Sequence, residues 1–167
     1  MADREQRQLV GDLHRLARDI ASDADILRRI AEDFRPIGTR TPPLGDEGSA
    51  FLAVKLHGWY TALEAILERI ARVIEGGAPS GPTSHMDLLR GAAMAIVDVR
   101  PRVLDPDHLT VLADLLGFRQ FFRHAYAVTL DEARLRHQAA AIAATGDAVR
   151  VDLDAFVGTV RAMIDEL

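Results

Sequence analysis

The part of the sequence with the most side chains able to do chemistry is Phe118–Tyr126, which holds two arginines, one histidine and one tyrosine among three phenylalanines. Arginine offers phosphate a permanently charged fork of donors, histidine can transfer a proton near neutral pH, and tyrosine can stack on a base. Together these groups suit RNA cleavage by the RNA's own 2′-OH without a metal ion: one accepts the 2′ proton and another stabilises the charged phosphorane. The phenylalanines are equally typical of a bundle core, so a purely structural helix is the alternative interpretation.

One straight helix cannot direct all of these groups at a single atom. Arg119, Arg123 and Tyr126 share a helix face at i, i+4 and i+7, whereas His124 lies about 140° around the axis from Arg119. Convergence of Arg119 and His124 therefore requires a helix end, a distortion or a second copy of the chain. A two-fold dimer would supply that copy, because it brings the same segment twice to one axis.

Arg119, His124 and Tyr126 form an R-x4-H-x-Y pattern that resembles the motif of HEPN-domain proteins, specifically the HepT-like toxins. The segments FRQFFRHAYAVTLD and HGWYTALEAILERIA also resemble a HepT-like subgroup, and the likeness covers roughly residues 5–167. The resemblance implies an all-α, HEPN-like up-and-down helical bundle that pairs into a homodimer, with the two motifs facing each other across the dimer cleft. It also implies a metal-independent endoribonuclease that requires no cofactor.

The same resemblance implies roles for single residues. Arg119 corresponds to the phosphate-binding arginine and His124 to the catalytic histidine, while Arg123 is interpreted either as an auxiliary phosphate contact or as a surface arginine. In type VII toxin–antitoxin systems the partner of HepT is a minimal nucleotidyltransferase antitoxin that can AMPylate the motif tyrosine, here Tyr126. An AMP group would bring bulk and negative charge into a phosphate-binding cleft, and would therefore block RNA.

Two other functions stay open beside the ribonuclease. A catalytically silent HEPN bundle that binds a nucleotidyltransferase or a nucleotide predicts a stable complex without RNA cleavage. A plain helical scaffold dimer predicts that His124→Ala changes nothing except, at most, stability.

The hydrophobic pattern that must position the cluster has a helical period throughout. Expected helices span, in chain order, residues 3–34, 49–75, 84–97, 106–122, 132–144 and 147–167. Pro36 is expected to end the first helix, and Thr145-Gly146 to divide the C-terminal region into two shorter helices. The expected N-caps are Ser84, Asp105, Asp131 and Asp147. The sequence thus predicts one domain over residues 1–167, with a long N-terminal helical hairpin followed by shorter helices.

Composition and charge exclude several classes of protein. There is no cysteine, so disulfides and thiolate sites are excluded, and a net charge of −5 argues against a dedicated duplex binder. The segment from Arg119 to Arg136 contains four arginines and two acidic residues, Asp131 and Glu132, which gives it a local charge of +2. This charge predicts a positive cleft on an otherwise acidic protein.

Several other signals are missing from the sequence. No segment has the length of a membrane span and the N-terminus lacks the apolar core of a signal peptide, so a soluble cytoplasmic protein is expected. No metal-binding motif occurs either, and the D-x-x-H spacing of Asp105 and His108 is interpreted as helix capping.

Overall fold

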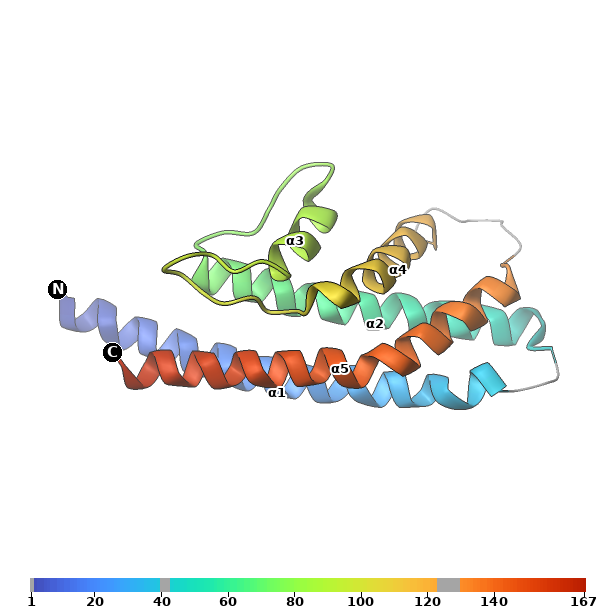
Figure 1. The fold of residues 1–167 in the computed structure, drawn as a ribbon, viewed down its shortest axis with the longest axis horizontal. Coiled ribbons are helices and arrows are strands. Elements are labelled where there is room, and N and C mark those ends of the chain that lie inside the picture. The colour runs from blue at the N-terminus through green and yellow to red at the C-terminus, as the bar shows by residue number, and fades with distance from the viewer. Residues whose placement is uncertain (1, 40–42, 123–129) are drawn as a thin grey trace.

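The chain folds into α-helices, as the computed structural model shows for residues 2–39, 43–122 and 130–167 (Figure 1). In chain order the elements are α1 (Ala2–Thr39), α2 (Gly45–Ile74), α3 (Ser84–Ala92), the short 3-10 helix η1 (Pro106–His108), α4 (Leu109–Phe122) and α5 (Glu132–Asp165). Within these residues no strand forms, and an isolated bridge joins Ile96 to Arg100. The predicted all-α class and the long N-terminal helix are confirmed.

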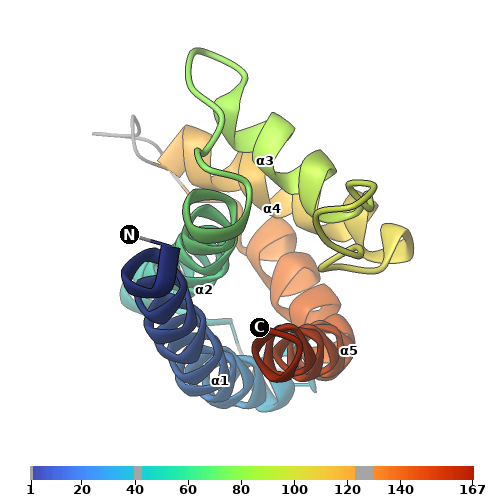
Figure 2. The same cartoon turned by 90° about the vertical axis from the view of Figure 1, so that its left-hand side faces the viewer.

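Three helices, α1, α2 and α5, run along the length of the molecule, with α1 antiparallel to the other two (Figure 1). The end view shows α3 and α4 on the side of the bundle that lies away from α1 (Figure 2). Every α-helix contributes apolar side chains to one buried cluster. Trp59 of α2 is fully buried there, and its indole Nε1 donates a hydrogen bond to the carbonyl of Leu27 in α1 at 3.0 Å. The helical hairpin α1–α2 is therefore fixed by a polar contact as well as by packing.

The most extensive helix contact joins α1 to α5, and it corrects one prediction. Thr145-Gly146 does not break the C-terminal region, because α5 is a single helix of 34 residues. Gly146 faces α1 at a point where an added Cβ would lie 2.7 Å from the Cβ of Ala31. The glycine therefore permits a close helix crossing rather than a break. Asp147 forms an ion pair with Arg35 at 2.6 Å instead of capping a separate helix, so the prediction of only shorter C-terminal helices was wrong.

The ends of the other helices also differ from the predicted ones. Helix α1 continues through Pro36 to Thr39, because a proline in the last turn removes little from the hydrogen-bond ladder. Helix α2 begins at Gly45 rather than Ser49, with Asp46 and Glu47 in its first turn, where acidic groups favour the helix dipole. Helix α3 ends at Ala92 rather than near Val97.

Of the four predicted N-caps, Asp105 and Asp131 are present, whereas Ser84, like Asp147, is not a cap. The Asp105 side chain accepts a hydrogen bond from the Asp107 N–H at 3.0 Å, as capping of η1 requires. The Asp131 side chain accepts from the N–H groups of Ala133 and Arg134 at 2.9 and 3.2 Å, which fixes the start of α5. At α3 the cap position is Thr83 rather than Ser84, and it makes no capping hydrogen bond.

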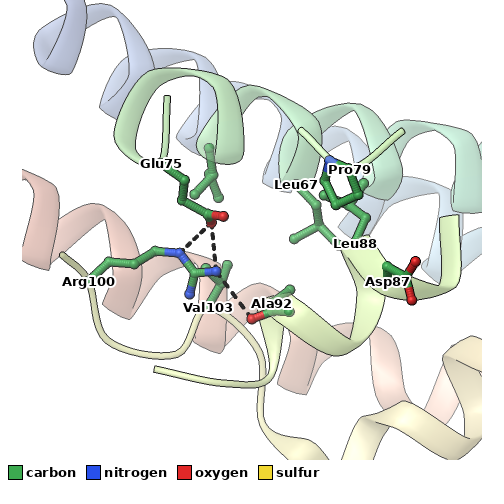
Figure 3. A pocket seen from close by; sticks show the side chains of 10 residues that line it. Leu67, Glu75, Pro79, Asp87, Leu88, Ala92, Arg100 and Val103 are labelled. Carbon is green, nitrogen blue, oxygen red and sulfur yellow. Dashed lines mark hydrogen bonds and ion pairs between the residues drawn. The ribbon is translucent and has the colours of Figure 1, made fainter. Parts of the chain in front are cut away.

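The connection between α3 and η1 is held by Arg100, a buried side chain below the end of α2 (Figure 3). Its guanidinium contacts the Glu75 carboxylate at 2.6 Å and also donates to the carbonyls of Gly91, Met94 and Pro101. The cavity beside it measures about 30 Å³, which is room for roughly one water molecule. The contacts of Arg100 therefore have a structural role.

Among the described residues, no helix combines the length and the apolar character that crossing a membrane requires.

Candidate functional site

Of the four residues expected in the site, Arg119 is the one that the structure describes. It lies in the last turn of α4, which ends at Phe122. Arg123, His124 and Tyr126 fall outside the described residues, so their assignment to the site stays a prediction. The site is therefore built outward from Arg119.

Arg119 points into the bundle toward α2, and only 7% of the residue is exposed. Its Nη2 lies 2.6 Å from Oε2 of Glu64, a buried ion pair between α4 and α2. Its Nε donates to the hydroxyl of Thr61 at 3.3 Å, and the guanidinium carbon lies 6.0 Å from the centre of the Tyr60 ring. All three partners come from α2, where Glu64 lies four positions after Tyr60 and three after Thr61 and so is a surface neighbour of each.

Glu64 is itself 5% exposed and has a second partner. Its Oε1 accepts a hydrogen bond from Nδ1 of His85, in the first turn of α3, at 2.5 Å. The His85 side chain is 32% exposed, so it reaches from the surface to a buried carboxylate. One carboxylate therefore joins side chains from α3 and α4, and each of its oxygens has its own donor.

The environment of this ion pair affects the ionisation of Tyr60. Burial raises the pKa of the Tyr60 phenol well above its ordinary value, and the negative charge of Glu64 raises it further. The positive charge of Arg119 acts in the opposite direction. The phenol is therefore un-ionised at neutral pH.

One atom of the Arg119 guanidinium is buried without a hydrogen-bond partner. This atom is Nη1, and two other side-chain atoms share that condition among the described residues, Oε1 of Gln138 and Nε of Arg150. A buried donor without an acceptor costs about 1–3 kcal/mol. The guanidinium therefore has one donor that no acceptor satisfies in the structure, and this donor is enclosed by the surrounding side chains.

The phenylalanines around Arg119 separate into core and surface residues. Phe118 is buried, and its ring stacks on Phe122 with centroids 5.7 Å apart and planes at 20°. The ring of His57, from α2, lies 5.7 Å from Phe122 on a tilted plane. Phe121 is 47% exposed. The core interpretation therefore holds for Phe118, while Phe121 has the exposure that a base-stacking residue needs.

The charge count that predicted a positive cleft changes once the ion pairs are included. Arg134 lies 3.8 Å from Asp114, and Arg136 lies 2.7 Å from Glu132. Together with Arg119 and its partner Glu64, every described arginine of that segment has a carboxylate beside it. The positive cleft stays a prediction, and these three side chains supply less unbalanced charge than the sequence count indicates.

In the described part of the chain, no three His, Asp or Glu side chains cluster closely enough to hold a metal ion.

Comparison with protein families finds a match that begins within α2 and ends within α5. A family model described as HepT-like protein matches residues 51–160, which is most of the chain and includes Glu64, His85 and the R-x4-H-x-Y motif. The protein belongs to the HepT-like family. This HepT-like HEPN protein has no match among curated proteins or solved structures. Helix α1 lies outside the matched residues, and the site surrounding Arg119 lies within them.

The sequence patterns do not predict the roles of Glu64 and His85 beside Arg119. Glu64 does carry a signal, since it occupies a position in the apolar stripe of α2 between Tyr60 and Leu67 where a carboxylate needs a partner. His85 carries no such signal, because its neighbours in the sequence do not indicate that α3 packs against α2 at that point.

Proposed function

We propose that this HepT-like protein is a metal-independent endoribonuclease toxin that acts in the cytoplasm, with Arg119 and His124 in its active site. The observation that carries the proposal is the complete R-x4-H-x-Y motif within the HepT-like match, with its arginine held by Glu64 and one guanidinium donor left over. A functional arginine that is fixed before the substrate arrives loses less entropy on binding.

In the proposed reaction, the 2′-OH of RNA attacks the adjacent phosphorus while His124 accepts its proton. The bond from phosphorus to the 5′-oxygen breaks, the leaving oxygen takes up a proton, and a 2′,3′-cyclic phosphate forms. Arg119 stabilises the negative charge of the phosphorane, and Arg123 adds a phosphate contact. A homodimer would bring two such motifs to one cleft and supply the second proton-transfer group.

The proposed antagonist is a minimal nucleotidyltransferase that transfers AMP to the hydroxyl of Tyr126. The negative phosphodiester and the bulky nucleoside would then occupy the space that RNA needs. The motif tyrosine lies seven positions from Arg119 and two from His124, so the modification would fall at the site itself.

Cleavage of RNA in the presence of EDTA tests this function. We expect the purified protein to cut total cellular RNA to products with 2′,3′-cyclic phosphate ends, and His124→Ala to abolish cleavage. His137→Ala is the matched control, because His137 is an exposed residue of α5 that is not part of the motif sequence. Intact RNA with a folded wild-type protein, and normal growth of cells that express it alone, would contradict the proposal.

One observation favours a second function, a silent HEPN bundle that binds a nucleotidyltransferase. Arg119 is buried and its charge is balanced by Glu64, as in a structural ion pair. A protein of this kind would form a stable complex with the nucleotidyltransferase in size-exclusion chromatography. It would cleave no RNA, and His124→Ala would leave the complex unchanged.

A further inference from the structure

The carboxylate of Glu64 lies between two side chains from different helices. Oε2 contacts Nη2 of Arg119 at 2.6 Å, and Oε1 contacts Nδ1 of His85 at 2.5 Å. The three residues come from α2, α4 and α3, so the contact joins three helices that pack against one another. His85 is the member of this trio closest to solvent.

The second hydrogen bond determines how the carboxylate is oriented. With one donor alone, a carboxylate can rotate about its last torsion, because terminal sp³–sp² torsions are broad. Donors on both oxygens fix its plane, and this plane then fixes the fork of the guanidinium that pairs with it. An ionised carboxylate only accepts, so the Nδ1 of His85 must carry the proton in this contact.

The second hydrogen bond also changes the charge that Arg119 presents. Glu64 balances the guanidinium charge and would weaken its attraction for a phosphate. The hydrogen bond from His85 to Oε1 occupies the second carboxylate oxygen, so Arg119 pairs with Oε2 alone. The guanidinium is therefore held on one side by Glu64 and Thr61, while its Nη1 is buried without a hydrogen-bond partner.

We propose that His85 is a positioning residue of the site: through Glu64 it fixes the orientation of the Arg119 guanidinium, the group that binds a phosphate of RNA in the proposed function. This inference rests on the proposed function, since it takes Arg119 to be a phosphate ligand. His85 itself does not touch the substrate.

The test measures the affinity of the protein for a 2′-O-methyl RNA oligonucleotide, which binds but cannot be cleaved. We expect His85→Ala to weaken binding about tenfold, the scale on which metal sites respond to loss of an outer hydrogen-bond partner. His85→Asn keeps a donor close to the position of Nδ1, and it should restore affinity to within about twofold of wild type. His137→Ala, on the exposed face of α5, should leave affinity unchanged.

A double-variant background shows whether His85 acts through the ion pair. Glu64→Gln combined with Arg119→Gln removes both charges and so avoids an unbalanced one that would unfold the protein. In this background we expect His85→Ala to have no further effect on affinity. An equal loss of affinity from His85→Ala in the wild-type and double-variant backgrounds would overturn the inference. Full affinity of the His85→Ala protein would also overturn it, and so would a His85→Asn protein that binds as weakly as His85→Ala. Circular dichroism verifies that each variant is folded.

Cleavage of unmodified RNA is measured on the same proteins and separates this inference from the proposed function. A wild-type protein that binds but does not cleave would refute the ribonuclease proposal and leave the affinities to decide the role of His85. A wild-type protein that does not bind RNA would overturn both.

Discussion

Arg119 and Glu64 form an ion pair of 2.6 Å with both side chains buried, one on α4 and the other on α2. Two charges removed from water depend on each other, because either one alone would face a solvation loss of several kcal/mol. The first residue of the R-x4-H-x-Y motif is therefore part of the folded structure as well as of the proposed site.

Removing Glu64 should destabilise the protein strongly. Glu64→Ala leaves Arg119 as a buried, uncompensated charge, and we expect a loss of about 3–5 kcal/mol in the free energy of unfolding by urea. The control is Glu68→Ala in the same helix, whose carboxylate pairs with Arg72 at the surface and should cost less than about 1 kcal/mol. Equal losses for the two variants would contradict the burial of the ion pair.

Gly146 should tolerate alanine poorly although it lies inside a helix. An added Cβ would approach the Cβ of Ala31 to 2.7 Å, so Gly146→Ala must push α5 away from α1 and lower the melting temperature. Gly158 lies in the same helix with nothing within 4 Å of an added Cβ. Gly158→Ala should therefore stabilise the protein by about 0.5–1 kcal/mol, from helix propensity alone. If both variants raise the melting temperature, the close approach of the two helices is refuted.

Arg100→Lys should loosen the connection between α3 and η1. Lysine keeps the charge but lacks the planar fork that reaches Glu75 and three carbonyls at once. We expect a loss of about 2–4 kcal/mol in stability, because buried carbonyls lose their donors. Hydrogen exchange should become faster in residues 93–105 and stay slow in α1 and α5. Unchanged exchange in the connection would show that Arg100 does not hold it.

The phenol of Tyr60 should resist ionisation in alkaline solution. Its pKa in the folded protein is raised by burial and by Glu64, so folding favours the protonated phenol. The stability that this shift contributes is complete below the pKa of an unfolded tyrosine, near 10, and decreases as pH rises above it. Absorbance at 295 nm of the Tyr126→Phe variant reports Tyr60 alone, and it should rise only when the protein unfolds. A simple titration near pH 10 in the folded state would disprove this environment for Tyr60.

The helical class and most helix positions could be predicted because the apolar period and the local caps are short-range signals. Asp105 and Asp131 act on the N–H groups two or three positions away, and both caps are present as predicted. The predicted helix break at Gly146 was wrong, because a glycine inside a helical pattern looks the same in the sequence whether it ends a helix or allows a second helix to pack closely. The neighbour, Ala31, lies more than a hundred positions away in the chain.

The site was predictable in part for the same reason. The motif is local, so the sequence names Arg119 as a candidate, but the burial of Arg119 and its pairing with Glu64 depend on the packing of α4 on α2. His85 joins the same carboxylate only because α3 folds back onto α2, which no spacing in the sequence indicates. The roles of Arg123, His124 and Tyr126 stay predictions, since these residues lie outside the described part of the chain.

The packing of α1 against α5 also has a consequence for how the protein is made. Helix α1 leaves the ribosome before the other described helices, and its principal partner α5 is synthesised after them. Until α5 emerges, the apolar face of α1 has only α2 to cover it, and contacts between distant parts of a chain form slowly. A nascent chain therefore cannot complete its interior before translation has passed α5. The proposed ribonuclease activity would therefore arise only after that point.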